Sequence, residues 1–96
     1  MSDTATVTKT KLQRPPLWTV VFLNDDFTPM QFVVRVLMEV FHQPLQEAHR
    51  IMLTVHKDGA ARVGAFTHEV AEQKVNETMR LALLSQHPLR VFAERL

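Results

Sequence analysis

The sequence predicts an α+β fold in which a small three-stranded antiparallel sheet packs against three helices, in the order β-α-α-β-α-β. Two observations lead to this prediction. Short runs rich in β-branched and aromatic residues occur near the start, in the middle and at the end of the chain. Between them lie segments whose apolar residues recur at helical spacing. Strands joined through helices favour one sheet covered by one layer of helices, and 96 residues allow one such domain.

The first element is a strand that follows a polar arm. Residues 1–14 are polar and have no hydrophobic period, so we expect them to form a flexible arm that Pro15-Pro16 closes. This gives an arm over 1–16 and a core domain over 17–96. Leu17–Leu23 is β-branched and aromatic, which predicts a strand buried on both faces, and Asn24-Asp25-Asp26 ends it in a turn.

Two helices follow this turn. Thr28 is the expected N-cap, with Pro29 in the first helical position and Gln31 completing a capping box, and the helix runs to about His42. Pro44 begins the second helix, which ends at Asp58-Gly59. The apolar face predicted for this second helix consists of Leu45, Ala48, Met52 and Val55.

The second half of the chain supplies a strand, a helix and a strand. Ala60–Phe66 is the second strand, in which Gly64 is a candidate bulge, and Thr67 caps the third helix. Residues 85–88 end that helix, and Leu89–Leu96 forms the last strand. The core face predicted for the third helix consists of Val70, Val75, Met79, Ala82 and Leu83.

Composition excludes several classes of function. The net charge is +1: residues 1–14 carry +2 and the remainder −1, so the folded part has no basic patch for nucleic acid. No apolar run approaches the ~18 residues of a membrane span. Cysteine is absent, which excludes disulfides and thiol chemistry. The cytoplasm is the simplest location for such a chain.

The acidic turn before the first helix has two interpretations. In the simpler interpretation, Asn24-Asp25-Asp26 is a solvated turn that leads into a helix. In the other, its oxygen atoms are acceptors aimed at a cation. A catalytic pair of carboxylates fits less well, because adjacent residues of a turn rarely approach one atom from two sides.

The histidines do not form a metal-binding pattern. His42, His49 and His56 are spaced by seven residues, and seven helical residues span about 10.5 Å, which is too far for two ligands of one zinc ion. We therefore expect no metal or cofactor. His56 ends an apolar helical stripe and is either a helix-end residue favoured by the dipole or, if the acidic turn lies nearby, part of a binding site.

Four sequence blocks resemble the ClpS adaptor family, and the resemblance covers the chain from about Leu17 to the C-terminus. These blocks are 23–33 (LNDDFTPMQFV), 52–56 (MLTVH), 64–75 (GAFTHEVAEQKV) and 87–89 (HPL). The family delivers N-degron substrates, proteins whose first residue is Leu, Phe, Tyr or Trp, to a Clp unfoldase–protease. The resemblance therefore implies a non-enzymatic adaptor that docks on the N-domain of a Clp AAA+ unfoldase, of the ClpA type. We expect the chain to be a monomer.

The resemblance also implies roles for individual residues. Asn24, Asp25 and His56 contact the substrate's α-amino group, and Asp26 supports the turn and the start of the substrate backbone. Met30 would reject β-branched first residues, although plain core filling is the simpler interpretation of its periodicity. The implied side-chain pocket consists of Thr28, Met30, Val33, Met52, Val55 and Leu89. The implied docking surface for the unfoldase consists of Glu69, Glu72 and Lys74.

Two other functions remain open at this point. One is an enzyme that uses His56 and Asp25 as an acid–base pair. Against this, the sequence shows no candidate nucleophile and no phosphate-binding loop. The other is a general protein-interaction module of similar fold that does not recognise N-terminal residues. The chain also departs from the family pattern, since Phe27 stands where relatives often have Tyr and the hydroxyl is missing.

Overall fold

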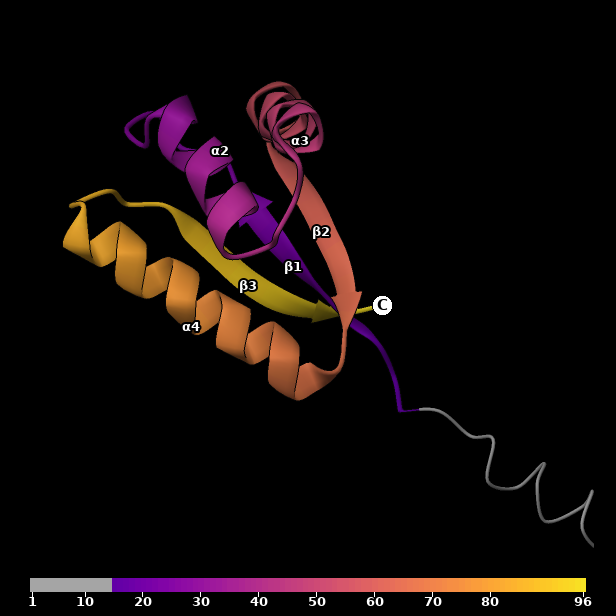
Figure 1. Ribbon diagram of the computed structural model, residues 1–96. Helices are drawn as coiled ribbons and strands as arrows, with labels where there is room; N and C mark the ends of the chain where they lie inside the picture. Colours follow the sequence, from indigo (N-terminus) through magenta and orange to yellow (C-terminus); the bar gives the residue numbers. More distant parts are fainter. Residues whose placement is uncertain (1–14) are drawn as a thin grey trace, which may run out of the picture.

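The computed structural model describes residues 15–96 and contains three strands and three helices in the predicted order. The flexible arm expected over 1–14 lies outside these residues. Figure 1 shows the arrangement along the chain. The elements are β1 (Trp18–Leu23), α2 (Met30–Glu39), α3 (Leu45–Asp58), β2 (Ala60–Phe66), α4 (His68–Leu84) and β3 (Arg90–Arg95).

The sheet is antiparallel throughout, with the strand order β2-β1-β3. As predicted, the central strand β1 is buried on both faces: residues 19–22 are each at most 4% exposed. The pairing of β1 with β2 shifts register between Trp18 and Val20, opposite Phe66 and Val63. Gly64 lies in this interval with φ 75°, so the predicted bulge is confirmed.

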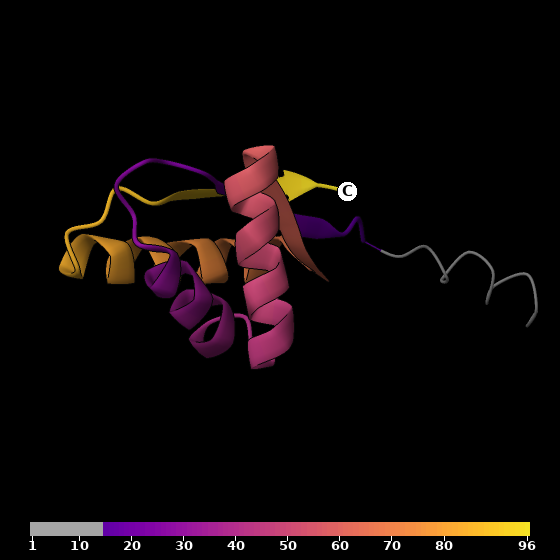
Figure 2. The same cartoon turned by 90° about the horizontal axis from the view of Figure 1, so that it is seen from above.

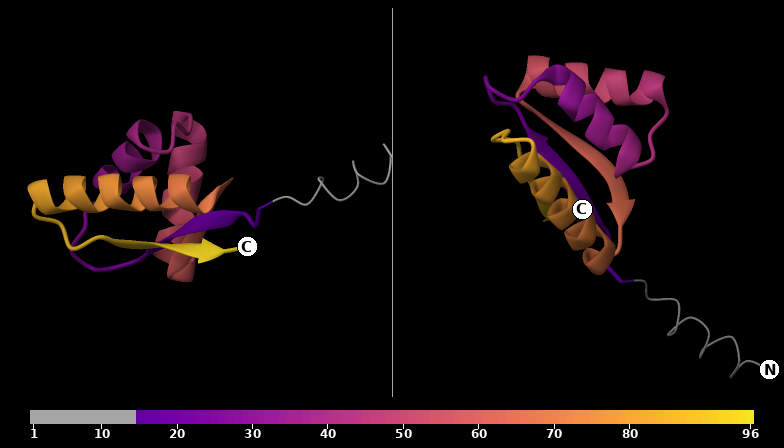
Figure 3. Two further views of the ribbon diagram at one scale, coloured as in Figure 1. Left: turned by 90° about the horizontal axis from the view of Figure 1, so that it is seen from below. Right: turned by 60° about the vertical axis from the view of Figure 1, so that its left-hand side comes forward.

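The helices pack on one face of the sheet (Figures 1 and 2). Val20 and Phe22 of β1 point into the same buried cluster as Val36 of α2, Val55 of α3 and Ala82 of α4. α2 and α3 lie side by side, and α4 packs along β3 and β1 (Figure 3). Among residues 15–96, no helix combines the length and the apolar composition that crossing a membrane requires.

An ion pair lies on the helix-free face of β1. Arg62 of β2 pairs with Val21 and Glu94 of β3 pairs with Thr19, so the two side chains reach toward each other above the central strand. The Arg62 Nε donates to Glu94 Oε1 at 2.7 Å. Thr19 and Val21 on this face are buried although no helix covers them.

The two helix N-termini after β1 and β2 differ from each other. Thr67 caps α4 as predicted, since its side chain accepts a hydrogen bond from Val70 N. The predicted cap at Thr28 is wrong: α2 begins at Met30 after Pro29, and no side chain caps it. The Thr28 hydroxyl donates to Asp25 instead, so the capping box with Gln31 does not form.

The end of α2 and the apolar face of α3 also differ from the prediction. α2 ends at Glu39 rather than near His42, which adopts a left-handed φ of 56° where the chain turns toward α3. Leu45, at the first turn of α3, is 61% exposed, and the buried residues are Ala48, Ile51, Met52 and Val55.

The predicted core face of α4 is largely wrong. Val70, Met79 and Leu83 are exposed, and small residues face the sheet instead. The buried residues of α4 are Ala71, Thr78 and Ala82. With Val75, which packs half-buried against the core, they lie at 71, 75, 78 and 82, a helical spacing that brings the backbone close to the strands. The prediction favoured a neighbouring face of the helix because larger apolar side chains lie on that face.

Candidate functional site

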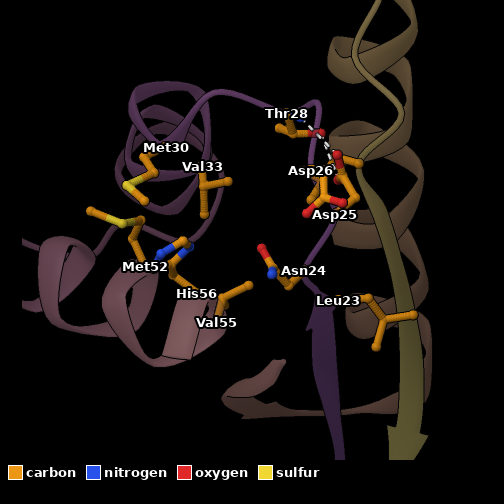
Figure 4. Close-up of a pocket in the computed structure, with 11 residues that line it drawn as sticks. Leu23, Asn24, Asp25, Asp26, Thr28, Met30, Val33, Met52, Val55 and His56 are labelled. Carbon is orange, nitrogen blue, oxygen red and sulfur yellow. Dashed lines mark hydrogen bonds between the residues drawn. The ribbon is translucent and has the colours of Figure 1, made fainter. Parts of the chain in front are cut away.

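A pocket forms where the turn after β1 meets the end of α3 (Figure 4). Its cavity measures about 170 Å³. All ten residues that were predicted for amino-group binding, turn support and the side-chain pocket line it. The lining residues are Leu23, Asn24, Asp25, Asp26, Thr28, Met30, Val33, Met52, Val55, His56 and Leu89.

Asp25 organises the acidic turn. Its Oδ1 accepts hydrogen bonds from Phe27 N at 2.8 Å and Thr28 N at 2.7 Å, and its Oδ2 accepts from the Thr28 hydroxyl at 2.7 Å. A carboxylate that accepts backbone N–H groups two and three residues ahead fixes the chain in a turn. The resemblance implied this supporting role for Asp26, whereas the hydrogen bonds described in the turn end on Asp25.

These contacts keep the Asp25 carboxylate ionised. Partial burial opposes the charge, but the hydrogen bonds from the Thr28 hydroxyl and from the N–H groups of Phe27 and Thr28 outweigh it. The Arg90 guanidinium adds a favourable interaction, and together they lower the pKa of Asp25 below its ordinary value. The turn therefore holds a fixed negative charge beside the cavity.

A backbone hydrogen bond brings α3 to this turn. Asn24 N donates to the Gly59 carbonyl at 2.9 Å, and Gly59 ends α3 with a left-handed φ of 90°. His56 lies one turn earlier in α3, so its ring reaches the cavity opposite the turn. Figure 4 shows the polar groups of Asn24 and His56 facing each other across the pocket.

The remaining wall is apolar and comes from α2 and α3. Val33, Met52 and Val55 are at most 6% exposed, whereas Met30, in the first turn of α2, is 43% exposed. Core filling therefore describes Met52 but not Met30, whose flexible thioether chain lies at the pocket's edge. The pocket thus combines lone-pair acceptors on one side with a hydrophobic wall on the other.

Leu23 is the one lining residue that the sequence analysis did not assign to the pocket. Its side chain points away from the other labelled residues, toward β3, in Figure 4. As the last residue of β1 it adjoins the turn, which is the only sequence signal for its position. Within 15–96, no group of three His, Asp or Glu residues is placed to hold a metal ion.

The predicted docking residues lie on α4, away from the pocket. Glu69 and Glu72 are exposed near the start of α4, and Glu72 lies 3.3 Å from His68. Lys74 is half-buried: its Nζ donates to the Val40 carbonyl at 2.8 Å, at the end of α2. The same ammonium lies 5.6 and 5.4 Å from the ring centroids of Phe41 and Phe66. Lys74 therefore links α4 to α2.

Comparisons with known proteins agree on one family. The model of the ATP-dependent Clp protease adaptor protein ClpS matches residues 13–92. The ClpS adapter protein of Roseobacter denitrificans is 54% identical over 90 residues, covering 94% of this chain and 80% of the relative. That of Brucella canis is 49% identical over 96 residues, covering 98% of this chain and 83% of the relative.

A solved structure shares the fold. Agrobacterium tumefaciens ClpS2, determined bound to L-phenylalaninamide, superimposes with a TM-score of 0.83 at 37% sequence identity. The match covers 86% of this chain and all of that one.

Proposed function

The chain belongs to the ClpS family of ATP-dependent Clp protease adaptors, and we propose that it recognises the first residue of protein substrates. In this proposal the pocket binds the free α-amino group and the bulky side chain of an N-terminal Leu, Phe, Tyr or Trp. The chain then delivers the bound protein to a Clp unfoldase of the ClpA type. The unfoldase hydrolyses ATP, and this chain acts as an adaptor without chemistry of its own.

The polar side of the pocket suits an ammonium group. An α-ammonium has three N–H donors and loses water when it enters a cavity, so it needs acceptors in several directions. The Asn24 amide oxygen and a nitrogen of a neutral His56 ring supply two of them from opposite walls. Their meeting in one cavity, through the Asn24–Gly59 hydrogen bond, is the observation that carries the proposal.

We propose Asp26 as the third acceptor in place of Asp25. The Asp25 carboxylate already accepts three hydrogen bonds inside the turn. Asp26 is exposed and lines the same cavity, and no hydrogen bond to its side chain is described within 15–96. Asp25 then contributes its charge and the shape of the turn, while Asp26 contacts the amine.

The apolar side of the pocket suits a large hydrophobic side chain. An engineered apolar cavity of about 150 Å³ holds benzene, and the cavity here measures about 170 Å³. Burying a Leu or Phe side chain contributes about 1.5–3 kcal/mol. The structural relative was solved with L-phenylalaninamide, a molecule that has both a free α-amino group and a phenyl ring. This ligand supports a site that requires both features together.

We propose that Glu69 and Glu72 contact the unfoldase N-domain and that Lys74 supports them from inside the fold. The two carboxylates are exposed on α4, on a different part of the molecule from the pocket. Lys74 is engaged with Val40, Phe41 and Phe66, so its contribution to docking is to hold α4 against α2. Substrate and unfoldase can then be bound at the same time.

The test compares peptides that begin with Phe and carry either a free or an acetylated N-terminus. The free peptide should bind and the acetylated one should not, because acetylation removes the charge and leaves the acceptors unpaired. His56→Ala should weaken binding of the free peptide about tenfold or more, the value of a hydrogen bond to a charged group. Lys57→Ala, its exposed neighbour on α3 outside the pocket, is the matched control.

Measuring the affinity of these peptides over a range of pH separates the proposal from a general interaction module. Affinity for the free peptide should fall as pH rises past the α-amino pKa of about 7.7–8.0. Equal binding of the free and acetylated peptides, or binding that ignores the first residue, would favour a module without N-terminal recognition.

A further inference from the structure

His68 lies between an aromatic ring and a carboxylate at the start of α4. Its imidazole ring stacks on the indole of Trp18, with 4.1 Å between the ring centroids and 28° between the ring planes. Its Nε2 lies 3.3 Å from Oε2 of Glu72, one helical turn further along α4. Trp18 is half-buried and packs against the core, so it supports the imidazole from the sheet side. The histidine is therefore held with one nitrogen toward the Glu72 carboxylate.

This cluster borders the surface proposed for docking on the unfoldase. Glu72 belongs to that surface, and Glu69 follows His68 directly in the chain. The side chains of His68 and Glu72 are 58% and 49% exposed, so a partner can reach both. The pocket lies at the other end of β1, since Trp18 begins this strand and Leu23, which lines the pocket, ends it (Figure 1). The effect of a change at His68 on docking can therefore be measured separately from peptide binding.

The histidine is the group of this cluster whose charge changes near neutral pH. Histidine gains or loses a proton between pH 5 and 8, whereas carboxylates and guanidinium groups keep their charges there. The charged neighbours on α4 are Glu69 and Glu72. On the sheet, the residues paired with Trp18 are Arg95 of β3, which is charged, and Phe66 of β2, which is not. Protonation therefore adds one positive charge beside the Glu72 carboxylate.

The charge on His68 determines how much of the Glu72 charge a partner meets. When the ring is neutral, the carboxylate presents its full negative charge to a basic side chain of the partner. When the ring is protonated, it forms an ion pair with Glu72, which then attracts a second cation less strongly. The face of the Trp18 indole also attracts a protonated imidazole, so the paired arrangement is held in place.

We propose that His68 competes with the unfoldase for Glu72, so that docking weakens as His68 becomes protonated. The inference rests on the proposed function and adds regulation of the docking surface by pH. The exposed carboxylates of Glu69 and Glu72 fit a basic surface on the unfoldase. His68 is a positioning residue in this scheme, because it acts on the partner through Glu72.

The test measures docking on the ClpA-type unfoldase of the same organism between pH 8 and 5.5. Wild type and His68→Gln should bind equally at pH 8, where histidine is neutral. At pH 5.5, wild type should bind about threefold more weakly than His68→Gln, which is the size of a surface charge interaction. Because both proteins meet the same unfoldase at each pH, their ratio cancels any titration of the partner. A ratio that stays constant over this range would overturn the inference.

Two further variants test the route through Glu72. His68→Arg places a permanent positive charge beside the carboxylate, so it should bind about threefold more weakly than wild type at pH 8. In a Glu72→Gln background, His68→Gln should no longer alter the pH profile of docking, because the carboxylate that His68 pairs with is absent. An effect of His68 that persists in that background would contradict competition for Glu72.

His49→Gln is the matched control, because it replaces another exposed histidine, on α3. It should keep the wild-type pH profile of docking, and loss of that profile in this variant would contradict the assignment to His68. His49 and His68 both lie outside the pocket. Affinity for a Phe peptide at pH 8 and the thermal midpoint should therefore match wild type in the variants of both residues, which verifies that the fold is intact.

Trp18 provides a readout that needs no partner. It is the single tryptophan of the chain, and a protonated imidazole quenches the fluorescence of an indole on which it stacks. The emission of wild type should therefore fall as pH is lowered from 8 to 5.5, whereas the emission of His68→Gln should stay level. Identical emission profiles of the two proteins would show that His68 does not titrate in contact with Trp18, and would overturn the inference.

The outcomes separate this inference from the proposed function. If wild type fails to bind the unfoldase at pH 8 as well as at pH 5.5, the proposed docking itself fails. If Glu72→Gln weakens docking at pH 8 but wild type and His68→Gln respond alike to acid, docking through α4 stands and only the role of His68 is wrong.

Discussion

The two junctions at which a strand leads into a helix use similar residues differently. At Phe66-Thr67-His68 the threonine side chain caps α4. At Asp26-Phe27-Thr28-Pro29 the threonine hydroxyl donates to Asp25, and α2 begins without a side-chain cap. The first junction stabilises a helix, whereas the second shapes a turn at the mouth of the pocket. A polar group next to a helix start thus serves either the helix or the site.

The largest expected effect comes from breaking the pocket junction. Asp25→Ala removes three hydrogen bonds from the turn, so it should lower both peptide affinity, about tenfold or more, and the free energy of unfolding, by about 2 kcal/mol. Asp26→Ala should lower affinity alone. Calorimetric titration with a Phe peptide and urea unfolding measure the two quantities. Unchanged affinity in Asp25→Ala would show that the turn does not hold the site.

A smaller effect is expected at the other junction. Thr67→Ala removes the N-cap of α4 and should reduce the free energy of unfolding by about 1 kcal/mol. Peptide affinity should stay at the wild-type value, because Thr67 lies outside the pocket. The same two measurements apply, and weaker peptide binding by Thr67→Ala would mean that the junctions are not independent.

The smallest effect is a difference in acid sensitivity. Asp25 has a lowered pKa in the folded protein, so its charge stabilises the fold above the ordinary aspartate value of about 3.9. This stabilisation is lost as pH falls through the lowered pKa. The difference in the free energy of unfolding between wild type and Asp25→Asn should therefore shrink on acidification from pH 7 to 2. Urea unfolding at each pH measures this difference.

The uncharged cap provides the comparison for that titration. Thr67 does not ionise, so the stability difference between wild type and Thr67→Ala should stay constant over the same range. A parallel pH dependence in both pairs would indicate a global effect of acid rather than the titration of Asp25.

Local signals made the order and most limits of the elements predictable. Gly59 ends α3 with a left-handed φ, and Gly64 marks the bulge in β2, because each position requires a conformation that glycine adopts without strain. A methyl group on Gly64 would also clash with the Phe66 ring. Each of these constraints depends on one or two neighbouring residues, so it can be predicted from the sequence alone.

Features that depend on which of several partners a group meets in the folded chain were not predictable. The choice of Thr28 between a helix cap and Asp25 depends on the shape of the turn, and propensity describes only the first option. The buried face of α4 was not predicted because the close approach of Ala71 and Ala82 to the sheet depends on tertiary packing. Likewise, the half-burial of Lys74 follows from Val40 and Phe41, which lie more than thirty residues away.

The site itself was predicted from both sources. Residue chemistry suggested that acceptors at Asn24 and His56 would form a site if the turn reached the end of α3, and the Asn24–Gly59 contact meets that condition. The resemblance supplied the rest of the pocket. The resemblance implied amine contact for Asp25 and turn support for Asp26, whereas the hydrogen bonds of the turn end on Asp25. Sequence alone does not show this, since adjacent carboxylates differ only in which neighbours their oxygen atoms meet.

The link between Asn24 and Gly59 joins a main-chain amide to a main-chain carbonyl. Ordinary replacement of either side chain leaves both of these atoms in place, and only proline at position 24 would delete the donor. Substitutions can therefore exchange the side chains that face the ligand while the backbone contact between the turn and the end of α3 is kept. Adaptors built this way can diverge in cargo preference through a few surface substitutions, with no need to rebuild the scaffold.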